Sequence, residues 1–142
     1  MEPLDLSKQP PRAPRTELDG IIFLARSVDK ARAYLDGGNR NGYNIPGVTG
    51  GMLERFGISD DDFIAAVGAA ASDADVAAFV RGRINQATVD EWNAFIKERE
   101  PRGNRNLPAV LEIYPWLKEQ PSMRLVLDIL AEDEPRRFSR YA

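Results

Sequence analysis

Two charged residues lie on the apolar face of a helix predicted near the start of the chain. Thr16 is a typical N-cap and Gly37 a typical residue after a helix end, which predicts a helix from about Glu17 to Asp36. The apolar face of this helix comprises Leu18, Ile21, Leu24, Ala25, Val28 and Leu35. Arg32 falls within that face and Asp29 on its edge. Because an unpaired buried ion costs several kcal/mol, any fold must pair these side chains or give them a ligand.

The segment before this helix, residues 1–15, is predicted to be an extended arm. Pro10, Pro11 and Pro14 fix φ, lack amide donors and keep the preceding residues out of the helical region. Leu4 and Leu6 are expected to pack this arm against the body of the protein.

Short helices are predicted through the rest of the chain, each marked by a capping residue or by proline. They cover about 52–56 before Gly57, 60–69 after Ser59, a segment after Ser72, a segment opened by a capping box of Thr88 and Glu91, a segment from Pro108 that Pro115 must break, and about 122–132. No stretch alternates apolar and polar residues with a period of two, so no strand is predicted. The sequence therefore predicts an all-α fold: a compact multi-helix bundle with an extended proline-rich N-terminal arm.

Chain length favours a single helical domain over residues 1–142, because a chain of about 150 residues buries roughly 70% of its unfolded surface. Residues 136–142, with Arg136, Arg137 and Arg140, are expected to form a flexible basic tail. The acidic, proline-rich start differs from a signal peptide, and no stretch approaches about 18 uninterrupted apolar residues. We therefore expect a cytoplasmic protein without a membrane span.

The chain contains neither cysteine nor histidine. A disulfide, a thiolate nucleophile, a Cys/His zinc site and a Ser-His-Asp triad are therefore excluded within this chain. No metal site and no cofactor is predicted. The net charge is -3 and the basic residues are dispersed, so no nucleic-acid surface is expected.

The inward charged pair lies close in sequence to a glycine-rich loop over residues 37–51. Asp29 and Arg32, joined by Arg15 from the arm and by Tyr43 and Asn44 from the loop, form the predicted ligand-binding set. Arginine offers a planar fork to carboxylate or phosphate, and asparagine offers both a donor and an acceptor. The same residues also fit a structural network in which Asp29 clamps Arg32 and ties the arm to the bundle. Both interpretations stay open.

Two neighbouring features are interpreted more plainly. The run Gly47–Gly51 before a short helix fits either an anion-binding nest or a flexible connection. Arg26 and Lys30 point away from the apolar face and are expected on the solvated surface. A solvated lysine keeps its charge, which argues against an imine-forming role for Lys30.

The predicted function is binding of a small polar or anionic metabolite near the first helix and the glycine-rich loop. An alternative is a protein interaction module or subunit without catalysis, in which the arm and the region of Tyr114 and Trp116 meet a partner. A third is an enzyme with Asp29 as base and Arg32 or Tyr43 as electrophile. It ranks lower, because a neighbouring arginine would lower the pKa of a carboxylate whose role needs it raised. No oligomeric state is predicted.

A resemblance adds to this interpretation. It is carried by Asp5-Leu6-Ser7, Pro10-Pro11-Arg12, Pro14-Arg15, Leu18-Asp19-Gly20, Leu24-Ala25-Arg26, Asp29-Lys30-Ala31-Arg32 and Tyr43-Asn44 followed by Pro46. In these motifs the chain resembles a family of small bacterial proteins classed as a domain of unknown function. The resemblance implies a stand-alone bacterial protein and no established activity. Relatives carry Cys after the Asn and an Asp-Gln pair after the Pro, where this chain has Ile45 and Val48-Thr49-Gly50-Gly51.

Overall fold

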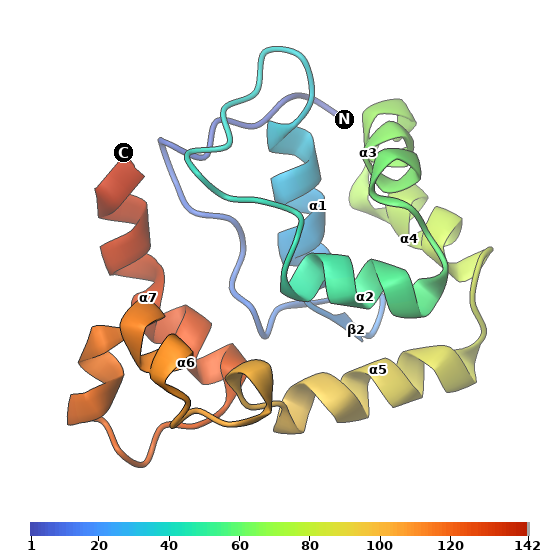
Figure 1. Cartoon of the computed structure of the whole chain (residues 1–142). Coiled ribbons are helices and arrows are strands. Elements are labelled where there is room, and N and C mark those ends of the chain that lie inside the picture. The colour runs from blue at the N-terminus through green and yellow to red at the C-terminus, as the bar shows by residue number, and fades with distance from the viewer. Residues whose placement is uncertain (142) are drawn as a thin grey trace.

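The computed structural model describes residues 1–141, and α1 (Leu24–Ala33) runs through the middle of the molecule (Figure 1). The other elements are β1 (Glu17–Leu18), β2 (Ile21–Ile22), α2 (Val48–Phe56), α3 (Asp60–Ala69), α4 (Asp73–Arg81), α5 (Gln86–Glu98), the 3-10 helix η1 (Pro101–Gly103), α6 (Pro108–Ile113), the 3-10 helix η2 (Pro115–Glu119) and α7 (Val126–Tyr141). The fold is thus mostly helical with one small two-stranded sheet, which corrects the all-α prediction.

The sheet is a β-hairpin formed by residues predicted to be the first turns of a helix over 17–36. β1 and β2 are antiparallel, with Glu17 opposite Ile22. Asp19 and Gly20 form the turn with φ of 52° and 73°. A two-residue Asp-Gly turn with both φ values positive has the twist that a hairpin needs. The predicted helix is therefore too long at both ends.

The main core lies where α1, α2, α3 and α5 meet. α1 packs against α3 and α4 on one side, while α5 contacts α2, β2 and α7 (Figure 1). Trp92 of α5 is 1% exposed, and its indole Nε1 donates to the carbonyl of Ile22 at 2.8 Å. α5 is thereby fastened to the hairpin that precedes α1.

The arm over residues 1–15 is packed against the body, as predicted, but it turns at residues 6–8 and 14–15 and is therefore not extended throughout. The amide of Leu4 donates to the carbonyl of Arg32 at 3.2 Å, and the amide of Leu6 donates to that of Asn39 at 2.8 Å. Leu6 is fully buried beside Tyr43. The arm therefore covers one side of α1 and holds the start of the glycine-rich loop.

Helix starts follow the predicted caps in part. Ser59 accepts from the amide of Asp62 at 3.1 Å and begins α3, as expected. The prediction that Thr88 and Glu91 form a capping box is wrong. Asn85 is the N-cap of α5, and its side chain accepts from the amide of Thr88 at 2.9 Å. Because the asparagine lies earlier in the sequence and already caps the first-turn amides, α5 begins at Gln86.

The last helix extends well beyond its predicted end near residue 132. α7 continues through residues 136–141, which were predicted to form a tail; residue 142 of that tail lies outside the described residues. Pro135 lies inside α7 and has no amide N–H, so the carbonyl of Ala131 receives no helical hydrogen bond. Ala131 is exposed, so water can donate to this carbonyl. Neither α7 nor another helix of the described chain is long and apolar enough to cross a membrane.

Gly47, the residue before α2, has φ 111° and ψ -133°, a conformation that disfavours residues with a Cβ. Gly47→Ala is expected to lower the free energy of unfolding by about 1–3 kcal/mol. Gly51 lies inside α2 with open space around an added Cβ, so Gly51→Ala is expected to be neutral or stabilising by up to about 1 kcal/mol. Urea unfolding of the two variants checks this, and equal effects at both positions would contradict it.

Candidate functional site

Arg26 and Lys30 of α1 are buried, which corrects the expectation that they are solvated. Their exposed fractions are 3% and 9%. They lie on the same side of α1 as Phe23, whose ring centroid is 5.9 Å from the guanidinium carbon of Arg26 and 5.3 Å from Nζ of Lys30. The prediction failed because the arm, the glycine-rich loop and α7 cover this side of the helix.

Arg26 lies at the centre of a hydrogen-bonded network. Its Nη1 is 2.5 Å from Oε1 of Glu134 in α7 and also donates to the carbonyl of Arg12 at 3.1 Å. Tyr43 donates from its hydroxyl to Oε2 of Glu134 at 2.9 Å, and the guanidinium carbons of Arg26 and Arg137 lie 5.7 Å and 4.4 Å from its ring centroid. Burial raises the pKa of Tyr43, and the charge of Glu134 raises it further. Tyr43 is therefore a neutral donor at physiological pH.

The side chain of Lys30 has no hydrogen bond or ion pair within the described part of the chain, and its Nζ lies over the ring of Phe23. Burial lowers its pKa from 10.5 to about 7, and the nearby charges of Arg26 and Arg137 lower it too, against the opposing effect of Glu134. Lys30 is thus an amine that is partly uncharged at neutral pH.

Asp29 is buried, at 6% exposed, as is Tyr43 of the same predicted set, at 1%. The partner of Asp29 is Arg12 of the arm rather than Arg32. The carboxylate accepts from the backbone amide of Arg12 at 2.7 Å and from its Nε and Nη2 at 3.0 Å each. Arg12 also reaches Asp73 of α4 at 2.8 Å. This ion pair ties the arm to α1 and α4.

The other predicted site residues lie apart from this network. Arg32 donates from Nε to the carbonyl of Glu2 at 2.9 Å. Arg15 pairs with Asp128 of α7 at 2.8 Å, and both side chains are about half exposed, at 51% and 45%. Asn44 is exposed. Of the predicted set, the structure brings together only Asp29 and Tyr43, through Arg12 and Arg26. We name the α1 cluster as Arg12, Arg26, Asp29, Lys30, Tyr43, Glu134 and Arg137.

A groove beside the α1 cluster has a volume of about 690 Å³. It lies between α2, α5, α6 and α7. Most of its lining is apolar: Val48, Trp92, Phe95, Ile96, Pro101, Val110, Ile113, Tyr114, Val126, Ile129 and Leu130. Ile113 is strongly exposed, at 49%, so part of this apolar lining faces solvent.

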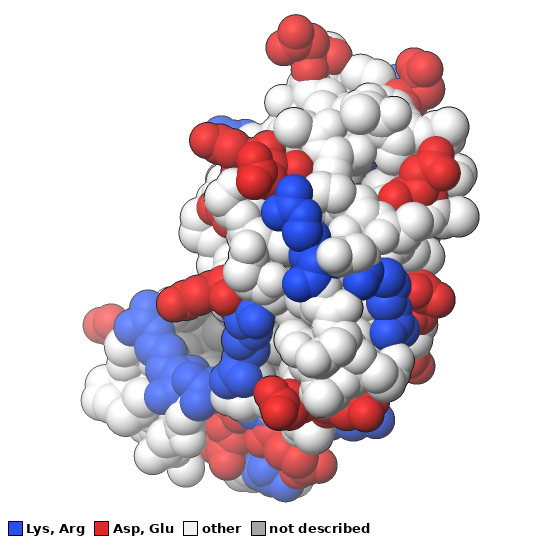
Figure 2. Space-filling view, turned by 90° about the vertical axis from the view of Figure 1, so that its right-hand side faces the viewer, with Lys and Arg blue, Asp and Glu red and all other residues white. Residues whose placement is uncertain are grey.

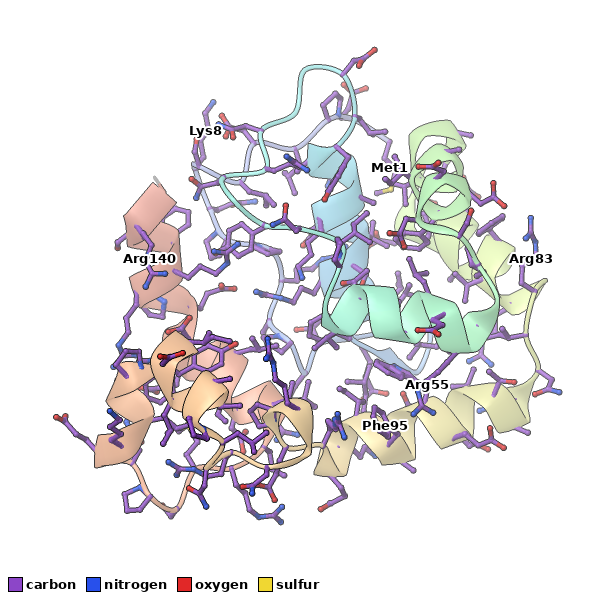
Figure 3. All side chains as sticks on the ribbon, viewed as in Figure 1. Met1, Lys8, Arg55, Arg83, Phe95 and Arg140 are labelled. Carbon is purple, nitrogen blue, oxygen red and sulfur yellow. The ribbon has the colours of Figure 1, made fainter. Side chains whose placement is uncertain are left out.

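Three arginines of the groove lining, Arg55, Arg99 and Arg102, are named here the rim arginines. Arg55 extends from α2 and lies over the ring of Phe95 in α5, at 3.8 Å from its centroid (Figure 3). Within the described chain, none of the three forms an ion pair with a carboxylate. Figure 2 shows basic side chains on both sides of a hollow in the lower part of the molecule.

The groove and the α1 cluster are neighbours. Tyr114 lines the groove, and burial raises its pKa, as does the charge of Asp133. The charges of Arg137, Arg102 and Arg26 act on the same hydroxyl in the opposite direction. Cations of both features therefore lie near one wall of the groove.

The sequence interpretation missed most of these residues. Arg12, Arg26 and Lys30 stand in the motifs that carry the resemblance, and the spacing of Phe23, Arg26 and Lys30 places them on one helix face. That spacing was the available signal for the cluster. The groove had no comparable signal in the sequence, because its walls come from four helices that lie far apart along the chain.

Comparison with known proteins gives a family. Residues 8–136 match the family model described as Domain of unknown function (DUF5069). The matched region begins in the arm and ends within α7, so it contains the groove lining and every member of the α1 cluster except Arg137. No curated protein matches the chain.

Proposed function

Since this chain belongs to the family described as Domain of unknown function (DUF5069), whose description assigns no activity, we propose from its geometry that it binds a small amphipathic anion. The apolar body of the ligand occupies the groove, and its carboxylate or phosphate meets the rim arginines. The observation that carries this proposal is an apolar cavity lined by three arginines that lack carboxylate partners in the described chain.

The size and lining of the groove support an apolar ligand body. Its volume of about 690 Å³ falls within the range of roughly 300–1,000 Å³ that small-molecule pockets have. Trp92 and Phe95 provide aromatic walls, and Ile113 remains exposed until something covers it. Burying this surface against a hydrocarbon would contribute about 0.8 kcal/mol for each methylene group.

The charges of the groove lining support an anionic group. The lining contains three arginines, Arg55, Arg99 and Arg102, and one acid, Glu54, although the chain as a whole has a net charge of -3. Arg55 and Arg99 both lie over Phe95, at 3.8 Å and 5.4 Å from its centroid. A guanidinium held on an aromatic ring keeps its edge available for a carboxylate or phosphate.

This site lies at the far end of the glycine-rich loop from the one predicted. Gly47, Val48 and Gly51 belong to the groove lining, so the proposed site also includes part of this loop. The carboxylate of Asp29 does not line the groove, and Arg12 already satisfies it. We still propose a small anionic ligand, as in the sequence analysis, but one that also has an apolar body, because most of the groove lining is apolar.

Binding of straight-chain carboxylates, measured by isothermal titration calorimetry, tests the proposal. From hexanoate to octanoate, affinity is expected to rise by up to about fourfold for each added methylene. Octan-1-ol is expected to bind at least about tenfold more weakly than octanoate, since a charge-assisted hydrogen bond contributes about 1.5–3 kcal/mol. Equal affinity for hexanoate and octanoate, or for octanoate and octan-1-ol, would contradict the proposal.

A pair of matched variants tests the place of binding. Arg55→Met removes an arginine stacked on Phe95 in the groove and is expected to weaken octanoate binding about tenfold. Arg83→Met removes an arginine stacked in the same way on Phe79, at 4.8 Å, but outside this groove. It is expected to leave octanoate binding unchanged. Equal losses in both variants would indicate a nonspecific effect of charge.

A further inference from the structure

Lys30 differs from every other lysine of the chain. Lys8, Lys97 and Lys118 are exposed, whereas Lys30 is 9% exposed and its side chain forms no hydrogen bond or ion pair within the described residues. A buried cation usually has a carboxylate partner, because desolvation is otherwise uncompensated. Glu134, the acid whose charge acts on Lys30, is already engaged by Arg26 and Tyr43.

Arg26 provides a second unsatisfied donor one helical turn away. Its Nε is buried and has no hydrogen-bond partner in the described chain, although its two terminal nitrogens are bonded. Lys30 and Arg26 therefore place an amine and a guanidinium N–H on the same side of α1, neither of which has a hydrogen-bond partner among the described residues. The pair is complementary to a compact molecule that carries an anionic group beside an electrophilic atom.

We propose that Lys30 is a nucleophilic amine that forms an imine with a small carbonyl compound whose carboxylate or phosphate is held by Arg26. This site is separate from the groove and does not depend on the ligand proposed there. Neither residue lines the groove.

The chemistry requires an uncharged amine beside permanent cations. Burial and the charges of Arg26 and Arg137 lower the pKa of Lys30 to about 7, so a large share of Lys30 is neutral at physiological pH. The two guanidinium groups stay charged there and can attract an anion. The Nζ lone pair adds to the carbonyl carbon, and the carbonyl oxygen leaves as water with the two hydrogens of the amine. No oxidant or other reactant is needed.

Reductive trapping tests this proposal in the unmodified protein. Glyoxylate and cyanoborohydride convert an imine into a stable carboxymethyl amine, which peptide mass spectrometry assigns to one lysine. At pH 7.5 the initial rate at Lys30 is expected to exceed the rate at Lys8, Lys97 and Lys118 by at least about tenfold, because a far larger share of Lys30 is neutral. A rate at Lys30 equal to or below that of the exposed lysines would overturn the proposal.

The anionic part of the substrate is tested by a second aldehyde. Glycolaldehyde is similar in size to glyoxylate but uncharged. The ratio of glyoxylate rate to glycolaldehyde rate at Lys30 is expected to be several times the same ratio at Lys97. Equal ratios would overturn the role given to Arg26. Fast labelling of Lys30 in the Arg55→Met variant is also expected, so failure of the groove proposal would leave this result intact.

Discussion

Lys30→Met is expected to raise the free energy of unfolding at pH 7 by roughly 3 kcal/mol. Burial and the charges of Arg26 and Arg137 lower the pKa of Lys30 from 10.5 to about 7 on folding. One pKa unit corresponds to about 1.4 kcal/mol, so burial and this repulsion together cost up to about 5 kcal/mol. Methionine has a similar length and no charge to desolvate. Part of the gain is lost because methionine packs differently against Phe23. Urea unfolding of the variant and the wild type measures the difference.

The same substitution is expected to change how stability depends on pH. Between pH 7 and pH 10.5 the unfolded lysine holds a proton that the folded one has released, so wild-type stability should rise with pH in this window. The rise from Lys30 is limited to about 1.4 kcal/mol per pH unit and should be absent in Lys30→Met. The charged groups that act on Lys30 are Arg26 on α1 and Arg137 and Glu134 on α7.

Lys97→Met is the matched control, since Lys97 is exposed and should change stability by no more than about 0.5 kcal/mol. A destabilised Lys30→Met protein, or one with the pH dependence of the wild type, would contradict the account of a costly amine. A residue that lowers stability where it stands is typical of functional sites.

Asp29→Ala is expected to lower the free energy of unfolding by about 3 kcal/mol. The substitution leaves the guanidinium and backbone amide of Arg12 without their main acceptor and loosens the arm from α1. The loss is at the lower end for a buried ion pair because Arg12 is 36% exposed and keeps Asp73 as a partner. The urea midpoint and the rate of proteolysis within residues 1–15 both report it.

Asp128→Ala serves as the control for this prediction. It removes the Arg15–Asp128 ion pair, which also ties the arm to a helix but is about half exposed on both sides. An exposed pair of this kind contributes less than about 1 kcal/mol. If both variants lose the same stability, the burial of Asp29 is not what holds the arm.

The local signals of the sequence predicted much of the fold. The arm, the start of α3 after Ser59 and the break at Pro115 follow from caps and prolines that act within a few residues. The hairpin was also predictable, because Asp19-Gly20 is a strong two-residue turn signal between short apolar runs. A helical pattern of apolar residues through this segment outweighed that signal, although strands of two residues are too short to show any alternation.

The candidate site depended on contacts between distant residues. The sequence indicated an inward acid at Asp29 and a contact to it from Arg15 of the arm. In the structure Arg12 contacts Asp29, whereas Arg15 pairs with Asp128 of α7. Lys30 was placed in solvent because one apolar face was assumed for the helix. Lys30 is buried because α7 is long enough to place Glu134 and Arg137 against α1. The residues near position 30 give no indication of the length of α7.

The central claim, that the groove binds an amphipathic anion, is tested most directly by NMR of the two tryptophan indoles. Trp92 lines the groove, whereas Trp116 does not and donates from its indole to Asp133. Titration of ¹⁵N-labelled protein with octanoate is expected to shift the Trp92 indole resonance saturably and several times further than that of Trp116. An unmoved Trp92 resonance up to the highest octanoate concentration, or equal non-saturating shifts of both, would contradict the claim.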